Sequence, residues 1–188
     1  MSEDPRTDLA HFLGPGETTA RADPPARISL TGELDPSAAA AVAIELMAHD
    51  GHSDEEVQLL IRSGDGTVAA ALLLMDTIDA MGVPVLGIGL GEVGGPALGV
   101  LAVCHRREVG PNSRIFLSTP SMQADGTAEE LSEAVRQAQL DVERFVARVA
   151  RATGQPLEKI EIDLRQGRQF DAQEAAAYRL IDGTWTRR

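Results

Sequence analysis

Residues 84–104 read PVLGIGLGEVGGPALGVLAVC. The first part, Pro84–Leu90, is short and almost wholly apolar, which is typical of a buried β-strand. The second part, Pro96–Cys104, predicts a helix, because proline is well placed in a first helical turn and small apolar residues follow it. This stretch therefore predicts a strand that passes through a glycine-rich turn into a helix.

The same order of elements recurs along the chain. Further strands are predicted at residues 28–30, 57–61 and 115–117, and further helices at residues 36–49 and 67–81. The Asp35-Pro36 pair supplies a helix cap followed by proline at the first helical position. Strand and helix alternating at intervals of roughly 30 residues are typical of parallel βαβ units with right-handed crossovers. We therefore predict an α/β fold.

The end of the chain carries one more helix signal. Asp171 and Glu174, three residues apart, predict a capping box at the start of a last helix. Leu180–Asp182 is predicted to close the domain as the end of a strand.

The turn between the predicted strand and helix carries no reactive side chain. A serine hydroxyl at such a turn can stand at the end of a sheet, facing a substrate. Here Gly95 has no side chain, and Pro96 has no backbone N–H with which to stabilise an oxyanion.

One element breaks the alternation, because Thr127–Thr153 predicts a long helix. Thr127 and Glu130 form a capping-box pattern, and Gly154 ends the helix. Apolar residues recur at alternating spacings of four and three, as in a coiled-coil seam: Leu131, Val135, Ala138, Val142, Phe145 and Val149. Two interpretations stay open. The seam packs on the chain's own core, or the helix protrudes and meets a partner subunit.

The composition of the chain argues against several classes of protein. The 188 residues carry a formal net charge of −12, which disfavours binding to nucleic acid. Cys104 is the only cysteine, so no internal disulfide can form, and no apolar run has the length of a membrane span. We predict a cytoplasmic protein with a flexible, proline-rich tail over residues 1–25 and one domain over residues 26–188. A short apolar patch, Leu9–Leu13, lies within that tail.

Several motifs stand in the order and at the spacings of one family. They are RISLTG (27–32), SGDG (63–66), DTI (76–78), PNSRI (111–115), TGQPLEKIE (153–161), AQEA (172–175) and LID (180–182). Over about residues 27–183 the chain resembles the proteolytic subunit of the ATP-dependent Clp protease (ClpP). The resemblance implies a ClpP/crotonase-like α/β fold with a protruding "handle" helix at about 127–153. It also implies two stacked rings that enclose a chamber, with ATPase rings docked outside, and no cofactor or metal.

That family uses a serine nucleophile, a histidine base and an orienting aspartate. The resemblance relates the serine position to Gly95, within Gly95-Pro96-Ala97. It relates the histidine position to Ser118, with Pro120 two residues later, and the aspartate position to Gly167. Asp163 matches an earlier acid that is not catalytic. Of the two oxyanion-hole amides, Gly66 is expected to keep its N–H, whereas Pro96 has none.

A relocated site has few candidate groups. Ser118, Thr119 and Ser121 are hydroxyls near the former histidine position, and His105 is a possible base. Cys104 is expected to be buried in an apolar environment. His49 and His52 are expected at the surface, and no histidine spacing suggests a metal site.

The leading hypothesis is a catalytically inactive Clp-like subunit that forms rings with itself or with active subunits. Docking of an ATPase is possible but doubtful, because Gln58, Leu60 and Ala80 stand where the family has aromatic residues. The alternatives are residual serine-type peptidase activity and an acyl-CoA enzyme of crotonase type, for which Glu92 is the nearest carboxylate.

Overall fold

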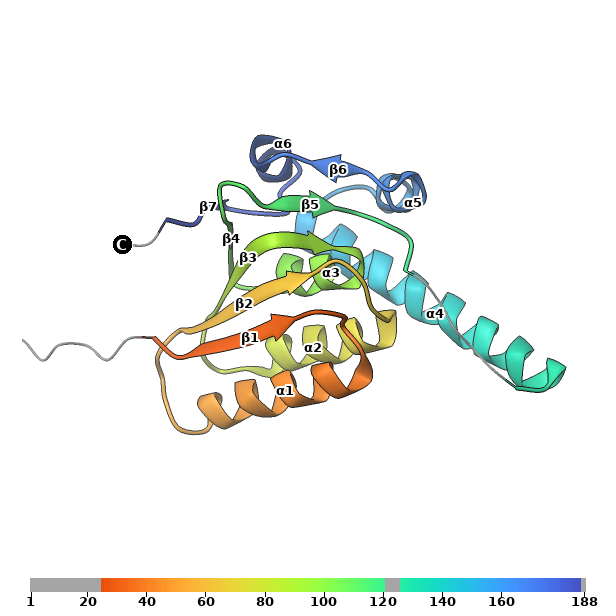
Figure 1. The fold of residues 1–188 in the computed structure, drawn as a ribbon, viewed down its shortest axis with the longest axis horizontal. Helices are drawn as coiled ribbons and strands as arrows, with labels where there is room; N and C mark the ends of the chain where they lie inside the picture. Colours follow the sequence, from red (N-terminus) through yellow and green to blue (C-terminus); the bar gives the residue numbers. More distant parts are fainter. Residues whose placement is uncertain (1–24, 121–125, 187–188) are drawn as a thin grey trace, which may run out of the picture.

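The computed structural model describes residues 25–120 and 126–186 and contains one mixed sheet with helices packed against it (Figure 1). The strands are β1 (Arg27–Thr31), β2 (Val57–Ser63), β3 (Val85–Gly94), β4 (Arg106–Val109), β5 (Arg114–Phe116), β6 (Gln169–Phe170) and β7 (Gly183–Thr184). The helices are α1 (Pro36–Asp50), α2 (Val68–Ala80), α3 (Gly95–Val103), α4 (Ala128–Thr153), α5 (Leu157–Gln166) and α6 (Ala172–Ala177). The predicted tail lies outside the described residues except for Pro25, so its extent stays a prediction.

The main sheet is parallel, in the order β1-β2-β3-β4-β7. Strand β5 pairs with the carboxyl-terminal end of β3, and β6 pairs antiparallel with β5. Helices α1, α2 and α3 lie together on one face of the sheet (Figure 1). The predicted α/β fold with parallel βαβ units is therefore confirmed.

The core is mostly aliphatic, since only 3% of the residues of the chain are aromatic. Leu59, Ile61, Leu74 and Leu98 are fully buried between the sheet and these helices. Among the phenylalanines of residues 25–120 and 126–186, only Phe145 of α4 is fully buried, and its ring packs where a side chain on Gly99 would otherwise stand. Glycine on α3 thus allows α4 to pack close to the sheet-bound helices.

Helix caps form as the sequence predicts. The Asp35 carboxylate accepts a hydrogen bond from the Ala38 N–H at 2.8 Å. Capping boxes close the start of α4, with Thr127 and Glu130, and the start of α6, with Asp171 and Glu174. These caps satisfy N–H groups that the first helical turn leaves without partners.

The prediction of a strand end at Leu180–Asp182 is wrong, because the short strand β7 begins only at Gly183. Arg179 adopts a φ of 65°, in the left-handed region, and the chain bends there. Asp182 then lies beside β4, where its N–H donates to the Arg107 carbonyl at 2.7 Å and its carboxylate accepts from the Arg107 guanidinium. This ion pair fixes the chain before β7 and lowers the pKa of Asp182, chiefly through the hydrogen bond from Arg107.

Candidate functional site: a strand-to-helix turn at the end of the sheet

The turn at Gly94–Pro96 joins β3 directly to α3. Strand β3 runs four residues further than predicted, because Glu92–Gly94 pair with β5. Gly95 is the first residue of α3 and has a φ of +50°, a left-handed conformation that glycine tolerates best. The structure thus has a sharp strand-to-helix turn, the geometry that exposes a nucleophile in other enzymes.

Ser118 lies next to this turn. A Cβ placed on Gly95 would lie 3.6 Å from the Ser118 Oγ and 3.2 Å from the Gly64 carbonyl oxygen. The two positions that the resemblance relates to serine and histidine are therefore brought together in space. The atoms that face each other are a glycine Cα and a hydroxyl, with no imidazole between them.

Gly167 lies beside the segment that carries Ser118. The Leu117 N–H donates to the Arg168 carbonyl at 2.8 Å, and the Thr119 hydroxyl donates to the Leu164 carbonyl at 3.2 Å. Gly167 itself has a φ of 64° and ends α5 as a left-handed cap. At the position that the resemblance relates to the aspartate, Gly167 therefore ends a helix and supplies no carboxylate.

Neither of the two positions expected to form the oxyanion hole, Gly66 and Pro96, offers a free N–H. Pro96 is buried and has no N–H. The Gly66 N–H is present, but it donates to the Asp65 carboxylate at 2.7 Å. Gly66 could therefore receive a substrate oxygen only after Asp65 moved away, and the negative charge of Asp65 opposes an oxyanion at this place.

The groove beside the turn is rich in carboxylates. It measures about 470 Å³, and Glu33, Asp65 and Glu92 contribute three acidic side chains to its lining. Glu92 lies against Gly64 and pairs with Arg114 at 3.5 Å. An acyl-CoA enzyme needs two amide donors to polarise a thioester beside such a carboxylate, and Pro96 removes one of them.

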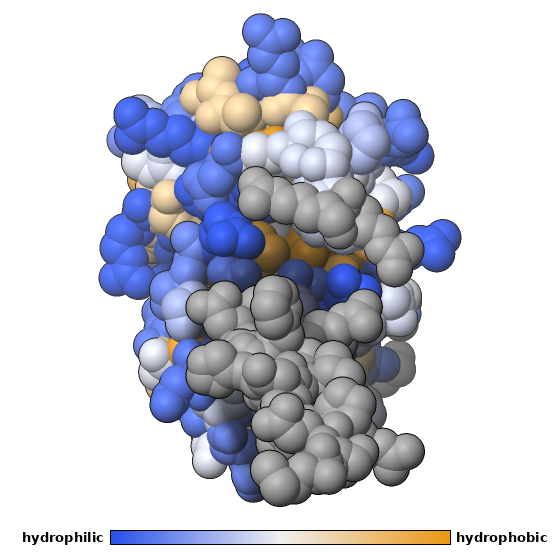
Figure 2. Space-filling model, turned by 90° about the vertical axis from the view of Figure 1, so that its left-hand side faces the viewer, coloured by the Kyte–Doolittle hydropathy of each residue, from blue (hydrophilic) through white to orange (hydrophobic). Residues whose placement is uncertain are grey.

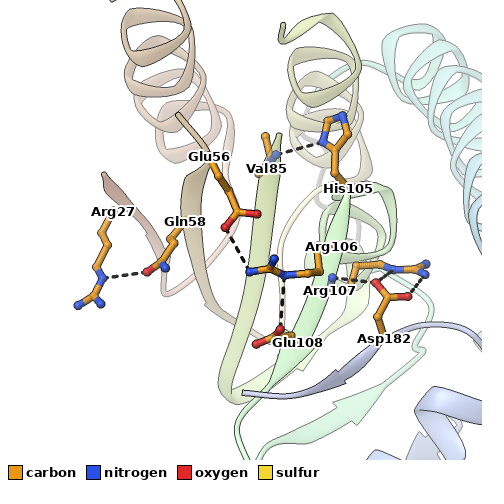
Figure 3. Close-up of polar contacts among 9 residues, drawn as sticks. All are labelled: Arg27, Glu56, Gln58, Val85, His105, Arg106, Arg107, Glu108 and Asp182. Carbon is orange, nitrogen blue, oxygen red and sulfur yellow. Dashed lines mark hydrogen bonds and ion pairs between the residues drawn. The ribbon is translucent and has the colours of Figure 1, made fainter. Parts of the chain in front are cut away.

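His105 lies far from this turn. Its Nδ1 accepts a hydrogen bond from the Val85 N–H at 3.1 Å, at the amino-terminal end of β3 (Figure 3). Gly95 follows the carboxyl-terminal end of the same ten-residue strand, and such a strand spans roughly 30 Å. His105 is thus not brought together with Ser118, and Ser121 lies outside the described residues.

Cys104 is buried, as predicted. Its thiol donates to the Val100 carbonyl at 3.3 Å, and burial raises its pKa to about 12. A thiol with so high a pKa forms little thiolate and is a poor nucleophile.

The other histidines serve the end of α1. His52 is exposed as predicted, and its Nδ1 lies 2.6 Å from the Ala48 carbonyl oxygen. His49 lies at the surface in a half-buried position, and its Nε2 lies 3.0 Å from the Glu55 carbonyl oxygen. Within residues 25–120 and 126–186, the structure holds no cluster of three His, Cys, Asp or Glu side chains fit for a metal ion.

Asp163 is a buried acid to which sequence reasoning gave no role. Its carboxylate accepts hydrogen bonds from the Tyr178 hydroxyl at 2.6 Å and from the Arg168 guanidinium at 3.2 Å. Burial, together with this carboxylate, raises the pKa of Tyr178 above its usual value. The contacts join α5 to the segment after α6 and so hold Gly167 in place. The one signal in the sequence was an acid among apolar residues on an amphipathic helix.

The sheet, the turn and the long helix define an α/β protein of the Clp protease class, and comparison with known proteins agrees. The model of the Clp protease family matches residues 17–188, so the chain belongs to this family. The ATP-dependent Clp protease proteolytic subunit 2 of Thermobifida fusca (strain YX) is 32% identical over 162 residues, which cover 85% of this chain and 80% of that protein. Among the helices of the described residues, none has the length and apolar character needed to cross a membrane.

Proposed function

We propose that this chain is a catalytically inactive Clp protease subunit that forms or modulates a ring-shaped complex in cytoplasmic protein degradation. One observation carries the proposal: at the turn where a family member would present its nucleophile, Gly95 has no side chain, and the hydroxyl of Ser118 lies beside it in place of an imidazole. An activated serine needs a base within hydrogen-bond reach, and neither His105 nor Cys104 offers one here.

The oxyanion hole supports the same proposal. Loss of one donor costs roughly 10²–10³ in rate. Here Pro96 supplies no N–H, and the Gly66 N–H is engaged by Asp65. With nucleophile and base also absent, we expect no turnover above background.

Two exposed apolar surfaces support assembly with other subunits. On α1, Ile44 and Met47 are 68% and 65% exposed, and alanines surround them. On the first half of α4, Val135 is 41% exposed and lies in a shallow groove with Ala138 and Val142. Apolar faces of this kind on helices usually meet another chain. We therefore assign α4 the part of the handle helix, meeting a second copy or an active subunit.

We further propose that binding of a Clp ATPase to this subunit is weak or absent. Gln58, which stands in place of an aromatic residue, accepts a hydrogen bond from Arg27 Nε at 2.9 Å. The polar pair leaves little apolar surface at this position for an incoming side chain. The site of action is proposed to be the cytoplasm, since the single cysteine is free and buried.

Labelling with a fluorophosphonate probe, read by intact-mass spectrometry, tests the loss of catalysis. We expect no adduct on the unsubstituted chain and none on Gly95→Ser, because that variant still lacks a base and the Pro96 amide. A known active Clp proteolytic subunit, treated in parallel, provides the positive control. An adduct on any serine or threonine of the unsubstituted chain contradicts the proposal.

Assembly is tested separately by native mass spectrometry of the chain alone and mixed with an active subunit from the same host. We expect rings that contain both chains and whose peptidase activity differs from that of the active subunit alone. A chain that stays monomeric in both samples contradicts the assembly part of the proposal and leaves the labelling result untouched.

A further inference from the structure

A groove of about 660 Å³ lies between α2 and α4. Its apolar lining consists of Ala69, Leu72, Leu73 and Ala147. Leu73 is 43% exposed, so a large apolar side chain faces water there. Single exposed leucines are common on protein surfaces, but a leucine that lines a groove together with other apolar residues is typical of a binding surface. The groove therefore offers a contact for apolar side chains.

The rim of this groove carries more cations than carboxylates. Three arginines and two aspartates contribute to it: Arg144, Arg148, Arg151, Asp76 and Asp141. Asp76 accepts a hydrogen bond from Arg148 at 2.6 Å, and Asp141 accepts one from Arg144 at 3.2 Å. Arg151 is 74% exposed, and 3.9 Å separate its Nη2 from a carboxylate of α2, which is too far for a hydrogen bond. The rim therefore keeps a cation that can pair with an acid from outside the groove.

One segment of the chain has the matching chemistry. Residues 8–13 read DLAHFL, an acid followed mainly by apolar side chains. Residues 1–24 as a whole carry five acids and two arginines, a formal net charge of −3. Residues 8–13 also precede residue 17, where the match to the Clp protease family begins. Their apolar character is therefore a property of this chain that the family match does not account for.

This segment is long enough to reach the groove. The described chain begins two residues before β1, on the side of the molecule that Figure 2 shows. Arg27 is in register with Gln58, and Gln58 with Leu86, so Arg27 lies about 10 Å from β3. Helix α2 ends just before β3, and Leu73 lies about 10 Å back along it. Residues 14–24 span up to roughly 35–40 Å when extended, which covers this path and the step from the sheet to the helix.

We propose that residues 8–13 of this chain bind the groove between α2 and α4. Leu9 and Phe12 cover Leu73 and the alanines around it, and the Asp8 carboxylate pairs with Arg151. A tethered segment is present at an effective concentration of roughly millimolar, so a weak contact suffices to keep the groove covered. Another chain then gains access to the groove only when this segment is released. The inference does not rest on the loss of catalysis.

The test is fluorescence anisotropy on the full chain with a labelled peptide of residues 5–17, PRTDLAHFLGPGE. We expect Leu9→Ser/Phe12→Ser, whose own segment no longer binds, to bind the peptide at least tenfold more tightly than the unsubstituted chain does. Adding Leu73→Ser to this variant should abolish the gain. The matched control adds Leu157→Ser instead. It changes a leucine of similar exposure, 44%, on α5 and should leave the gain intact.

Hydrogen exchange distinguishes the chain's own segment from that of a second copy. Exchange in α2 and α4 along the groove should be faster in Leu9→Ser/Phe12→Ser than in the unsubstituted chain, by the same factor at two protein concentrations. This comparison leaves the groove unchanged, so it stands if Leu73→Ser does not fold. Equal binding of the peptide to the unsubstituted chain and to Leu9→Ser/Phe12→Ser overturns the proposal, as does equal loss of the gain with Leu73→Ser and Leu157→Ser. Protection that grows with protein concentration also overturns it, because a second copy would then occupy the groove.

Discussion

The two halves of α4 share one apolar pattern but have different surroundings. In the second half, Phe145, Val146 and Val149 are 1%, 3% and 0% exposed and pack against the body of the protein. In the first half, Val135 is 41% exposed, and the helix extends away from the other elements (Figure 1). The seam continues across this boundary without a change of spacing.

This difference confirms packing of the seam on the chain's own core for the second half, and contact of the first half with a partner stays a proposal. A heptad-like pattern states only that one side of a helix is apolar. The second half uses that side for the chain's own core. In the first half, Val135 is exposed and Leu131 and Ala138 are partly buried.

Of the substitutions considered, Phe145→Ala should cause the largest loss in the free energy of unfolding. Removing a buried phenylalanine ring costs about 3–5 kcal/mol, and this ring fills the space over Gly99. Urea unfolding followed by circular dichroism should show that loss. The matched change in the first half of α4, which we call the free half, is Val135→Ala. It should leave the unfolding free energy within about 0.5 kcal/mol of the original value. Equal losses for the two variants would remove the distinction between the halves.

Arg148 lies in the second half of α4, between the buried residues Val146 and Val149. Its guanidinium donates to Asp76 and to Asp79 of α2, at 2.6 Å each, and its side chain is 17% exposed. Arg148→Met should lower the unfolding free energy by about 1–2 kcal/mol, because both charge-assisted hydrogen bonds are lost from a largely buried position. Thermal melts of this variant, beside Arg136→Met in the free half, measure the effect. A loss of similar size in both would contradict it.

Thr127→Ala should lower the local stability of the free half of α4 and leave the second half unchanged. Removal of the cap costs about 1 kcal/mol locally, and hydrogen exchange should accelerate in the first turn of α4 but not around Val149. The hydrogen bonds from Thr127 lower the pKa of Glu130. The capping box is therefore fully formed above about pH 4.5, the ordinary value for glutamate, and is lost as the pH falls through the lower value in the folded state. Exchange rates in this turn that do not respond to acid would contradict the assignment.

Val135→Asp should give the smallest change in the stability of the isolated subunit, within about 0.5 kcal/mol, because the side chain is exposed. It should nevertheless weaken association at least tenfold, since a charge would be buried in the contact. Sedimentation velocity over a range of concentrations measures association. Unchanged association would show that the free half of α4 is not an interface.

Alternation of short apolar runs and capped helices sufficed to predict the α/β fold. Strand β4 was not predicted, because the charged sequence Arg106-Arg107-Glu108 is typical of a surface loop. Pairing with β3 makes this segment a strand. Helix α5 was not assigned, since Pro156 provides no side-chain cap at its start. Propensity and periodicity are local, whereas these two elements depend on their neighbours.

The site was predictable only in part. Family motifs indicated which positions to inspect, and the structure brings Gly95 and Ser118 together and Gly167 beside them. The hydrogen bond from the Gly66 N–H to Asp65 could not be anticipated, because it depends on a side-chain rotation. The ion pair between Arg106 of β4 and Glu56, at 3.2 Å, likewise depends on the strand register, which the sequence alone does not reveal.

The left-handed backbone at Gly95 adds a cost in stability to any side chain placed there. Any residue with a Cβ there would have to accept a conformation that costs about 1–2 kcal/mol, with the Gly64 carbonyl 3.2 Å away. A serine at this position would thus lower the stability of the chain by about that amount, and it would still lack a base and the second amide donor.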